Sequence, residues 1–434
     1  MRLELGTFPV CDIVEGNSTS YHDGMLTVDL NNLTAKILDD PAIIYAEVEI
    51  ARPGDSTRIV GYRDVIEPRV KIEGPGICYP GICGRNAETV GRGTTHRLQG
   101  VGVVNLTDAR PAPRSAPSDR SHGFDTLFDM SGPSVESIPY GSLYNLCLLV
   151  NTDTNLSESA RAWAGEAAAI KVSDILADTV REATAPETEV FESPGTTTAL
   201  PRVVYISCHN SPEHYADAVR SYGTSIYGLS RLNAPWLLNP NEWLDGAVAG
   251  RDSWILANNP VIKDLYSRHG REIDFAGCIA IRTRWSQQVE KDVTSNQAAK
   301  VASQIEATGA VITWDAGGND FMEVIRTVQA CEKEGINTVF LTTEEHPDTG
   351  SPLLEPLPEA RAIVTTGWGR NELMPIDSVP AYDLPLPAVD VVIGRDTILA
   401  NQNSLSGSID AHDELRTIHW VDRYGSTAWS AYDY

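Results

Sequence analysis

The last third of the chain alternates short apolar runs with segments of helical composition, and this alternation restricts the possible folds more than any other feature. The strand-like runs and helical segments occupy residues 274–283, 295–309, 310–317, 319–335, 337–345 and 360–367. Apolar runs of this length, separated by amphipathic helices, are typical of parallel strands buried on both faces. The pattern therefore predicts an α/β region with a doubly wound parallel sheet.

A similar alternation begins further upstream. An apolar run at 144–153 is followed by the Ala-rich segment Ser157–Ala183, which begins with the Ser and Glu residues that favour a helix N-terminus. A second apolar run covers 201–210. A strand, a helix and a strand in this order predict a right-handed parallel crossover.

The first part of the chain has short β-like runs separated by clusters of Gly, Pro, Asn and Asp, which indicate turns. These runs are 26–30, 42–51, 57–62 and 96–106, and the proline-rich stretch Pro111–Asp119 is typical of an exposed loop. A chain of 434 residues exceeds the size at which one hydrophobic core stops growing. We therefore predict an α/β protein with a β-rich N-terminal module at 1–140, an α/β domain at 141–250, and a doubly wound α/β domain with a C-terminal extension at 251–434.

The acidic balance of the chain excludes one class of partner. There are 34 Lys and Arg residues against 59 Asp and Glu residues, a formal net charge of −25. Nucleic-acid binding depends on neutralising phosphates with basic side chains. No run approaches the roughly 20 apolar residues that span a bilayer, and Met1–Val10 lacks the basic and apolar regions of a signal peptide. We expect a cytoplasmic protein that binds neither nucleic acid nor membrane.

The cysteines follow no disulfide-scaffold spacing, and their number is odd, so we expect reduced thiols. They are Cys11, Cys78, Cys83, Cys147, Cys208, Cys278 and Cys331. Cys78 and Cys83 have C-x4-C spacing in a Gly/Pro loop, but a structural zinc needs two more ligands. Folding could recruit His96 and Cys11, although no second close pair exists at zinc-site spacing. We therefore predict no metal.

The carboxyl ends of parallel strands are where ligands bind in open sheets. Gly317, Gly318, Asn319 and Asp320 follow one predicted strand. The glycines allow close approach of a ligand to the backbone, and the two polar residues can cap the next helix. We interpret these four as candidate substrate-binding residues. The alternative is an ordinary cap and turn, because Asn and Asp are favoured at N-caps regardless of function.

Two carboxylates and an imidazole follow another predicted strand. Glu345 is a candidate for acid-base catalysis, Glu344 could bind a substrate ammonium group, and His346 lies beside them. The alternative is a solvated surface loop.

Two further candidates lie after the run at 360–367 and at the end of the run at 201–210. Gly367 and Asn371 form a candidate substrate-binding turn, in which Trp368 and Arg370 could accommodate a larger or anionic substrate. Cys208 followed by a histidine has the residue types of an activated thiol. Adjacent strand residues point to opposite faces, so the two can act together only if the strand has already ended.

The chain resembles a known family over most of its length. The resemblance is carried by MRLELGTFPVCDIV at the start and by residues 65–76, 91–100, 128–133, 244–270, 265–277, 331–345 and 391–394. In order and spacing these segments resemble the precursor of the alpha and beta subunits of glycine/sarcosine/betaine reductase component B. The turn with Gly367 and Asn371 is similar to a TGG-N turn of that family.

The segment 244–262 departs from the family at one point. The family has a cysteine-containing insert between a DGA block and an NNPVI block, and that cysteine becomes a pyruvoyl group when the precursor is cut. Here Asp245–Ala247 is followed by Val248–Ala257 and then by Asn258–Ile262, without a cysteine. We expect an intact chain with no cofactor. Self-cleavage at Ser253, the only hydroxyl in the shortened segment, is the alternative, because other pyruvoyl enzymes use serine.

The resemblance implies a subunit of a hetero-oligomeric oxidoreductase complex. Such a subunit binds an amino acid or methylated amine for reductive cleavage of a C–N bond, together with a second subunit that carries a reactive thiol or selenol. Two alternatives stay open. One is a noncatalytic subunit that stabilises a catalytic one, and the other is a diverged hydrolase or lyase acting on a C–N or C–S bond, centred on Cys208 or on Glu344 and Glu345.

Overall fold

The computed structural model contains the strands and helices of an α/β protein, so the class predicted from the sequence is confirmed. The structure describes residues 1–75, 90–108, 127–132, 135, 139–193, 199–210, 235–248, 253–283, 287–314, 321–342, 357–365, 389–394 and 430–431.

A four-stranded sheet carries the first part of the chain. Its strand order is β5 (Ile43–Ala51), β12 (Tyr144–Thr152), β10 (Val101–Asp108) and β7 (Asp64–Ile66). The two central strands are parallel and the outer ones antiparallel to them. Helix α1 (Leu30–Leu38) packs on β5, and α2 (Glu158–Asp178) packs on β10 and β12.

The predicted Ala-rich helix is confirmed and ends a little earlier than expected. Its first turn is capped by the Ser157 hydroxyl, which accepts a hydrogen bond from Ala160 N at 3.2 Å. The helix ends at Asp178 instead of Ala183, with the backbone N–H of Thr179 donating to carbonyls of the last turn.

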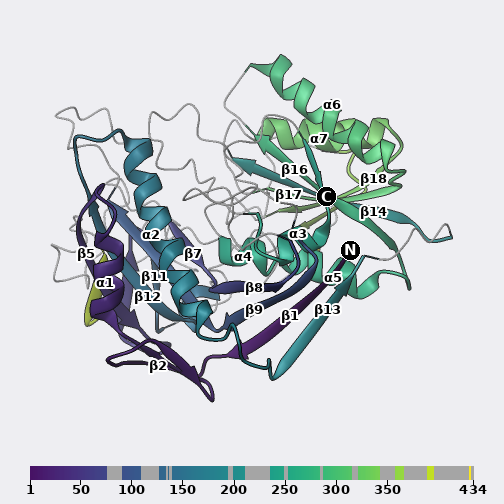
Figure 1. Cartoon of the computed structure of the whole chain (residues 1–434). Coiled ribbons are helices and arrows are strands. Elements are labelled where there is room, and N and C mark those ends of the chain that lie inside the picture. The colour runs from purple at the N-terminus through teal and green to yellow at the C-terminus, as the bar shows by residue number, and fades with distance from the viewer. Residues whose placement is uncertain are drawn as a thin grey trace.

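A second four-stranded sheet runs between the two main parts of the molecule (Figure 1). Its order is β13 (Glu187–Glu192), β1 (Arg2–Pro9), β9 (Gly93–Gln99) and β8 (Arg69–Glu73). The predicted run at 96–106 is divided here. Gly100, with φ +88°, turns the chain out of β9, and the run continues as β10 in the other sheet.

Two small sheets complete this part. One has the order β2 (Asp12–Glu15), β4 (Met25–Val28) and β3 (Ser20–His22). The other has β11 (Leu127–Asp129), β6 (Thr57–Val60) and β20 (Val391–Gly394), and the 3-10 turn η2 (Pro139–Ser142) lies beside it. Since β20 pairs with β6, a late segment of the chain returns to the N-terminal part.

The largest sheet carries the last part of the chain. Its order is β15 (Trp236–Leu238), β16 (Asp274–Thr283), β14 (Arg202–Asn210), β17 (Gly309–Trp314), β18 (Asn337–Thr342), β19 (Ala362–Thr365) and β21 (Ser430–Ala431). The five strands from β16 to β19 are parallel, and each edge strand is antiparallel to its neighbour.

Helices pack against both faces of this sheet. Helices α6 (Gln288–Gln304) and α7 (Phe321–Lys333) share a core with Val204. Helices α3 (Pro240–Leu244), α4 (Ser253–Ala257) and α5 (Pro260–Arg268) share a core with Tyr205, the next residue of β14. Side chains alternate across a strand, so the two cores lie on opposite faces. The second core also contains Leu3 and Leu5 of β1, which joins the two parts of the molecule.

Two details differ from the sequence-based expectation. The predicted parallel crossover from 144–153 to 201–210 is wrong, because β12 and β14 belong to different sheets and β13 lies between them along the chain. Helix α6 begins at Gln288 and not at Ser295, which lies inside the helix, where its hydroxyl donates to Glu323 O of α7 at 3.0 Å.

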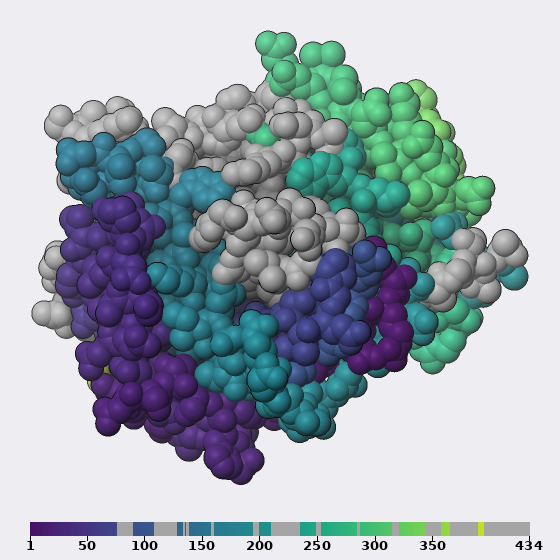
Figure 2. All heavy atoms as spheres, in the orientation of Figure 1, coloured from purple at the N-terminus to yellow at the C-terminus, as the bar shows by residue number. Residues whose placement is uncertain are grey.

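Figure 2 shows the residues of α1 and those of α6 and α7 at opposite ends of this face. Within the part of the chain that the structure describes, no helix has the length and apolar character needed to cross a membrane.

Candidate functional site

The segment from Leu244 to Asn258, here called the junction, connects α3 to α5. Both helices have strong start signals. The Asn239 side chain accepts from Asn241 N at 3.0 Å, and the Glu242 carboxylate accepts from Asn239 N at 2.6 Å. The Asn259 side chain accepts from Ile262 N at 3.1 Å, and a proline opens each helix. These caps fix the chain on either side of the junction.

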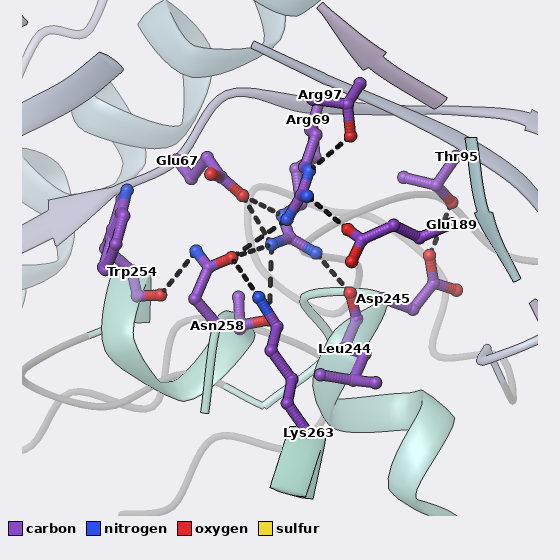
Figure 3. Close-up of polar contacts among 12 residues, drawn as sticks. Glu67, Arg69, Thr95, Arg97, Glu189, Leu244, Asp245, Trp254, Asn258 and Lys263 are labelled. Carbon is purple, nitrogen blue, oxygen red and sulfur yellow. Dashed lines mark hydrogen bonds and ion pairs between the residues drawn. The ribbon is translucent and has the colours of Figure 1, made fainter. Parts of the chain in front are cut away.

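Arg69 of β8 contacts both ends of the junction (Figure 3). Its Nη1 donates to Leu244 O, its Nη2 donates to Ala257 O at 3.3 Å, and its Nε donates to Glu67 Oε2 at 2.8 Å. The side chains of Arg69 and Glu67 are fully buried. One guanidinium therefore holds the two ends of the junction together.

Asp245, in the DGA block, is a second anchor. Its carboxylate accepts hydrogen bonds from Lys71 Nζ, from Gly91 N at 2.7 Å and from Thr95 Oγ1 at 2.5 Å. The side chains of Lys71 and Asp245 are both buried. Charge-assisted hydrogen bonds of this kind are among the stronger polar contacts in proteins. Asp245 thus attaches the beginning of the junction to β8 and β9.

Asn258, at the end of the junction, faces three cations. Its Nδ2 donates to Trp254 O at 3.0 Å, which turns Oδ1 toward the basic side chains. Oδ1 accepts from Arg97 Nη1 at 3.0 Å, from Lys263 Nζ at 3.4 Å and from Arg69 Nη2 at 3.5 Å. Burial, and then the positive charge of Arg97, lower the pKa of Lys263, although two nearby glutamates act in the opposite direction.

Ser253 lies at the start of α4 and is bound to a buried carboxyl pair. Its backbone N donates to Asp64 Oδ1 at 2.8 Å, and its Oγ donates to Asp64 Oδ2 at 2.6 Å. Burial, followed by the negative charge of Glu166 and a hydrogen bond between the two carboxyls, raises the pKa of Asp64 well above its usual range. Glu166 in turn accepts from Asn105 Nδ2 at 2.7 Å. The pair can therefore keep a proton that an exposed aspartate would lose.

The structure places Cys208 away from this site. Its side chain lies in the core shared with α6 and α7, whereas the ring of His209 lies 5.7 Å from that of Trp243 on the other face. Strand β14 continues through both residues, so the alternation of side chains separates them and they cannot act as a pair. The remaining candidates lie outside the described residues: Gly317, Gly318, Asn319, Asp320, Glu344, Glu345, Gly367 and Asn371.

Sequence reasoning missed most of the junction contacts. The run from Val65 to Gly76 was recognised only as part of a family resemblance. Its charged residues Glu67, Arg69 and Lys71 are spaced two apart, and residues two apart in a strand, such as Arg69 and Lys71 of β8, share one face. Charged side chains at such positions normally indicate a solvated face. Here that face is buried against the junction.

The expectation about metal binding can be compared only with the residues that the structure describes. They contain no group of three or more His, Cys, Asp and Glu side chains placed to hold an ion. Of the zinc ligands weighed above, Cys78 and Cys83 fall outside the described ranges. The His96 ring is buried, and its Nδ1 lies 2.8 Å from Val180 O.

Native-state alkylation is expected to distinguish the cysteines. With iodoacetamide and peptide mapping, exposed Cys11 reacts rapidly, whereas the buried thiols of Cys147, Cys208, Cys278 and Cys331 react only after unfolding. Burial is also the main reason why the pKa of Cys331 is raised to about 12. Labelling of Cys208 as fast as that of Cys11 would restore it as a candidate nucleophile.

Comparison with known proteins identifies the family. Residues 1–419 match the family described as glycine/sarcosine/betaine reductase component B subunits. The chain is 30% identical to the glycine reductase complex component B subunits alpha and beta of Acetoanaerobium sticklandii, over 96% of this chain and 94% of that protein. It is 30% identical to the betaine reductase complex component B subunit alpha of Peptoclostridium acidaminophilum (96% and 92% covered) and 29% identical to the sarcosine counterpart from the same organism (96% of each). No solved structure matches. With this match across nearly its whole length, the chain belongs to the family of glycine/sarcosine/betaine reductase component B subunits.

Proposed function

We propose that the chain is a cytoplasmic subunit of a reductase complex that binds an amino acid or a methylated amine for reductive cleavage of its C–N bond. Its relatives are named as component B subunits of glycine, betaine and sarcosine reductase complexes, which supports both the reaction class and the assembly with other subunits. The second subunit supplies a reactive thiol or selenol.

We further propose that the chain works uncut and without a pyruvoyl group. The observation that carries this proposal is the construction of the junction. No cysteine occurs between Asp245 and Asn258. Arg69 bonds to a carbonyl at each end, and the one hydroxyl, Ser253, is 1% exposed and donates to Asp64. A side chain that starts self-cleavage must attack the preceding carbonyl. The acceptor of the Ser253 proton is Asp64, whose pKa is raised by burial and by Glu166, and a carboxyl that keeps its own proton is a weak base for that hydroxyl.

Intact-mass spectrometry of the purified chain is expected to give one species at the full mass of 47.2 kDa. Treatment with a hydrazine should add nothing, since no ketone is present. Two fragments separated near residue 252, the second reacting with the hydrazine through its new terminus, would contradict the uncut state and assign self-cleavage to Ser253.

Reconstitution tests the place of the chain in a complex. Reductive cleavage of the substrate is expected only when the chain is mixed with a partner that carries a thiol or selenol, because the reaction needs an electron pair from that group. Activity of the chain alone would count against the proposal and in favour of a hydrolase or lyase. If the chain only stabilises its partner, the folded partner should have the same activity with and without the chain.

A further inference from the structure

The junction faces an unusual concentration of positive charge. Arg69 of β8 and Arg97 of β9 are direct cross-strand neighbours in an antiparallel pair. Like charges in this position normally destabilise a sheet. Lys263 of α5 extends toward the same place, and Figure 3 shows the three side chains pointing at Asn258. Three cations therefore converge on one neutral amide oxygen.

The carboxylates around this cluster do not balance it. Glu67 is buried against Arg69, and the half-exposed Glu189 accepts from Arg97 Nη2 at 2.5 Å. Among the described residues the cluster has three cations against these two anions. Lys263 forms no ion pair within 4 Å in the part of the chain described, and its hydrogen bond to Asn258 Oδ1 is a long one, at 3.4 Å.

These surroundings favour the neutral form of the lysine. A guanidinium stays charged at every accessible pH, whereas an amine can release its proton. Burial and the neighbouring guanidiniums therefore lower the pKa of Lys263. Partial desolvation and a neighbouring cation are the two features that activate a lysine as a nucleophile. The same guanidiniums attract an anion to the place where the amine lies.

We propose that Lys263 is a reactive amine that captures a small carbonyl compound bearing a carboxylate, of the 2-oxo acid class, as an imine. The nitrogen lone pair attacks the carbonyl carbon, and the C–O π electrons move to oxygen. The nitrogen loses its two protons, and these leave with the former carbonyl oxygen as water. A C=N bond thus replaces the C=O bond without oxidation or reduction. This inference goes beyond the proposed function and does not depend on it, because it needs only this chain.

Reductive trapping on the isolated, full-length chain tests the proposal. The chain is incubated with pyruvate and cyanoborohydride at neutral pH, and the modified lysines are quantified by peptide mapping. Lys300 and Lys333 serve as exposed internal references. Lys263 is expected to be modified at least about threefold faster than either reference, because more of it is in the neutral form. If burial acted only by blocking access to the reagents, Lys263 would be modified more slowly than the two reference lysines. Equal or slower modification of Lys263 would overturn the proposal.

Two substitutions change the charge next to the amine in opposite directions. Asn258→Asp is nearly isosteric and puts a carboxylate where the neutral oxygen lies. It should slow trapping at Lys263 and shift the dependence of the trapping rate on pH to higher pH. Glu189→Gln removes a carboxylate at a half-exposed position and should move the profile downward. Pyruvate should also be preferred over acetone at Lys263 and not at Lys300, since only pyruvate carries the anion. Unchanged profiles in both variants, or no preference for pyruvate, would contradict the proposal. A failed reconstitution with a partner subunit would leave these results unaffected.

Discussion

Arg69→Met is expected to lower the free energy of unfolding by about 3–5 kcal/mol, the usual cost of removing one partner of a buried ion pair. Methionine keeps much of the apolar volume of the arginine side chain. It removes, however, the donors that contact Leu244 O and Ala257 O and the guanidinium that faces Glu67. Burial acts to raise the pKa of Glu67, but Arg69, Arg97 and Lys263 outweigh it and keep the pKa below its usual value. Without Arg69 the Glu67 carboxylate stays buried but loses the nearest positive charge that stabilises it.

Urea denaturation followed by circular dichroism measures this effect. Arg2→Met is the matched control, because Arg2 is 54% exposed and its ion pair with Glu4 lies at the surface. The control should change the free energy of unfolding by no more than about 0.5 kcal/mol. The double variant Glu67→Gln/Arg69→Met should recover part of the loss, since both buried charges are then absent. If Arg69→Met unfolds at the same urea concentration as Arg2→Met, then Arg69 does not hold the junction together.

The sequence predicts the strand-and-helix pattern of the last part of the chain well. The run at 274–283 coincides with β16, because a continuous apolar run between polar flanks is typical of a parallel strand buried on both faces. Prediction fails where one side chain has two possible uses. Ser295 opens the predicted helix, but in the structure it lies inside α6 and its hydroxyl donates to α7, a contact that only the packing of the two helices determines.

The candidate site was predicted only in part, because residues that are far apart in the sequence meet there. Ser253 could be singled out as the one hydroxyl of the junction. Its partner Asp64 lies 189 residues earlier, and Glu166 reaches the pair from a helix of its own. Local patterns carry no information about which of 59 acidic residues meet in the core. That information comes from sheet order, which places β7 beside β10 and under α2.

The buried carboxyl pair leads to the second large expected effect, a dependence of stability on pH. The folded-state pKa of Asp64 is raised, while in the unfolded chain it returns to about 3.9. Between these two values the folded chain keeps a proton that the unfolded chain releases. The contribution of the pair to stability is therefore fully present below the unfolded pKa and is lost as the pH rises through the folded pKa. Inside this window the slope approaches about 1.4 kcal/mol per pH unit for one proton.

Asp64→Asn should remove this dependence, because an amide does not ionise. Its Nδ2 can donate to Glu166 and to the Ser253 hydroxyl, and its Oδ1 can still accept from Ser253 N, so the network keeps its shape. Urea denaturation of both proteins from about pH 5 to pH 8 should show the variant gaining stability relative to the parent chain as the pH rises. Asp39→Asn, at a position that is 59% exposed, controls for the loss of one surface charge and should leave the slope unchanged. If the free energy of unfolding depends on pH in the same way in the Asp64 variant and the parent chain, the carboxyl pair does not retain a proton. Ser253 would then donate to an ionised carboxylate, which could act as a base for its hydroxyl.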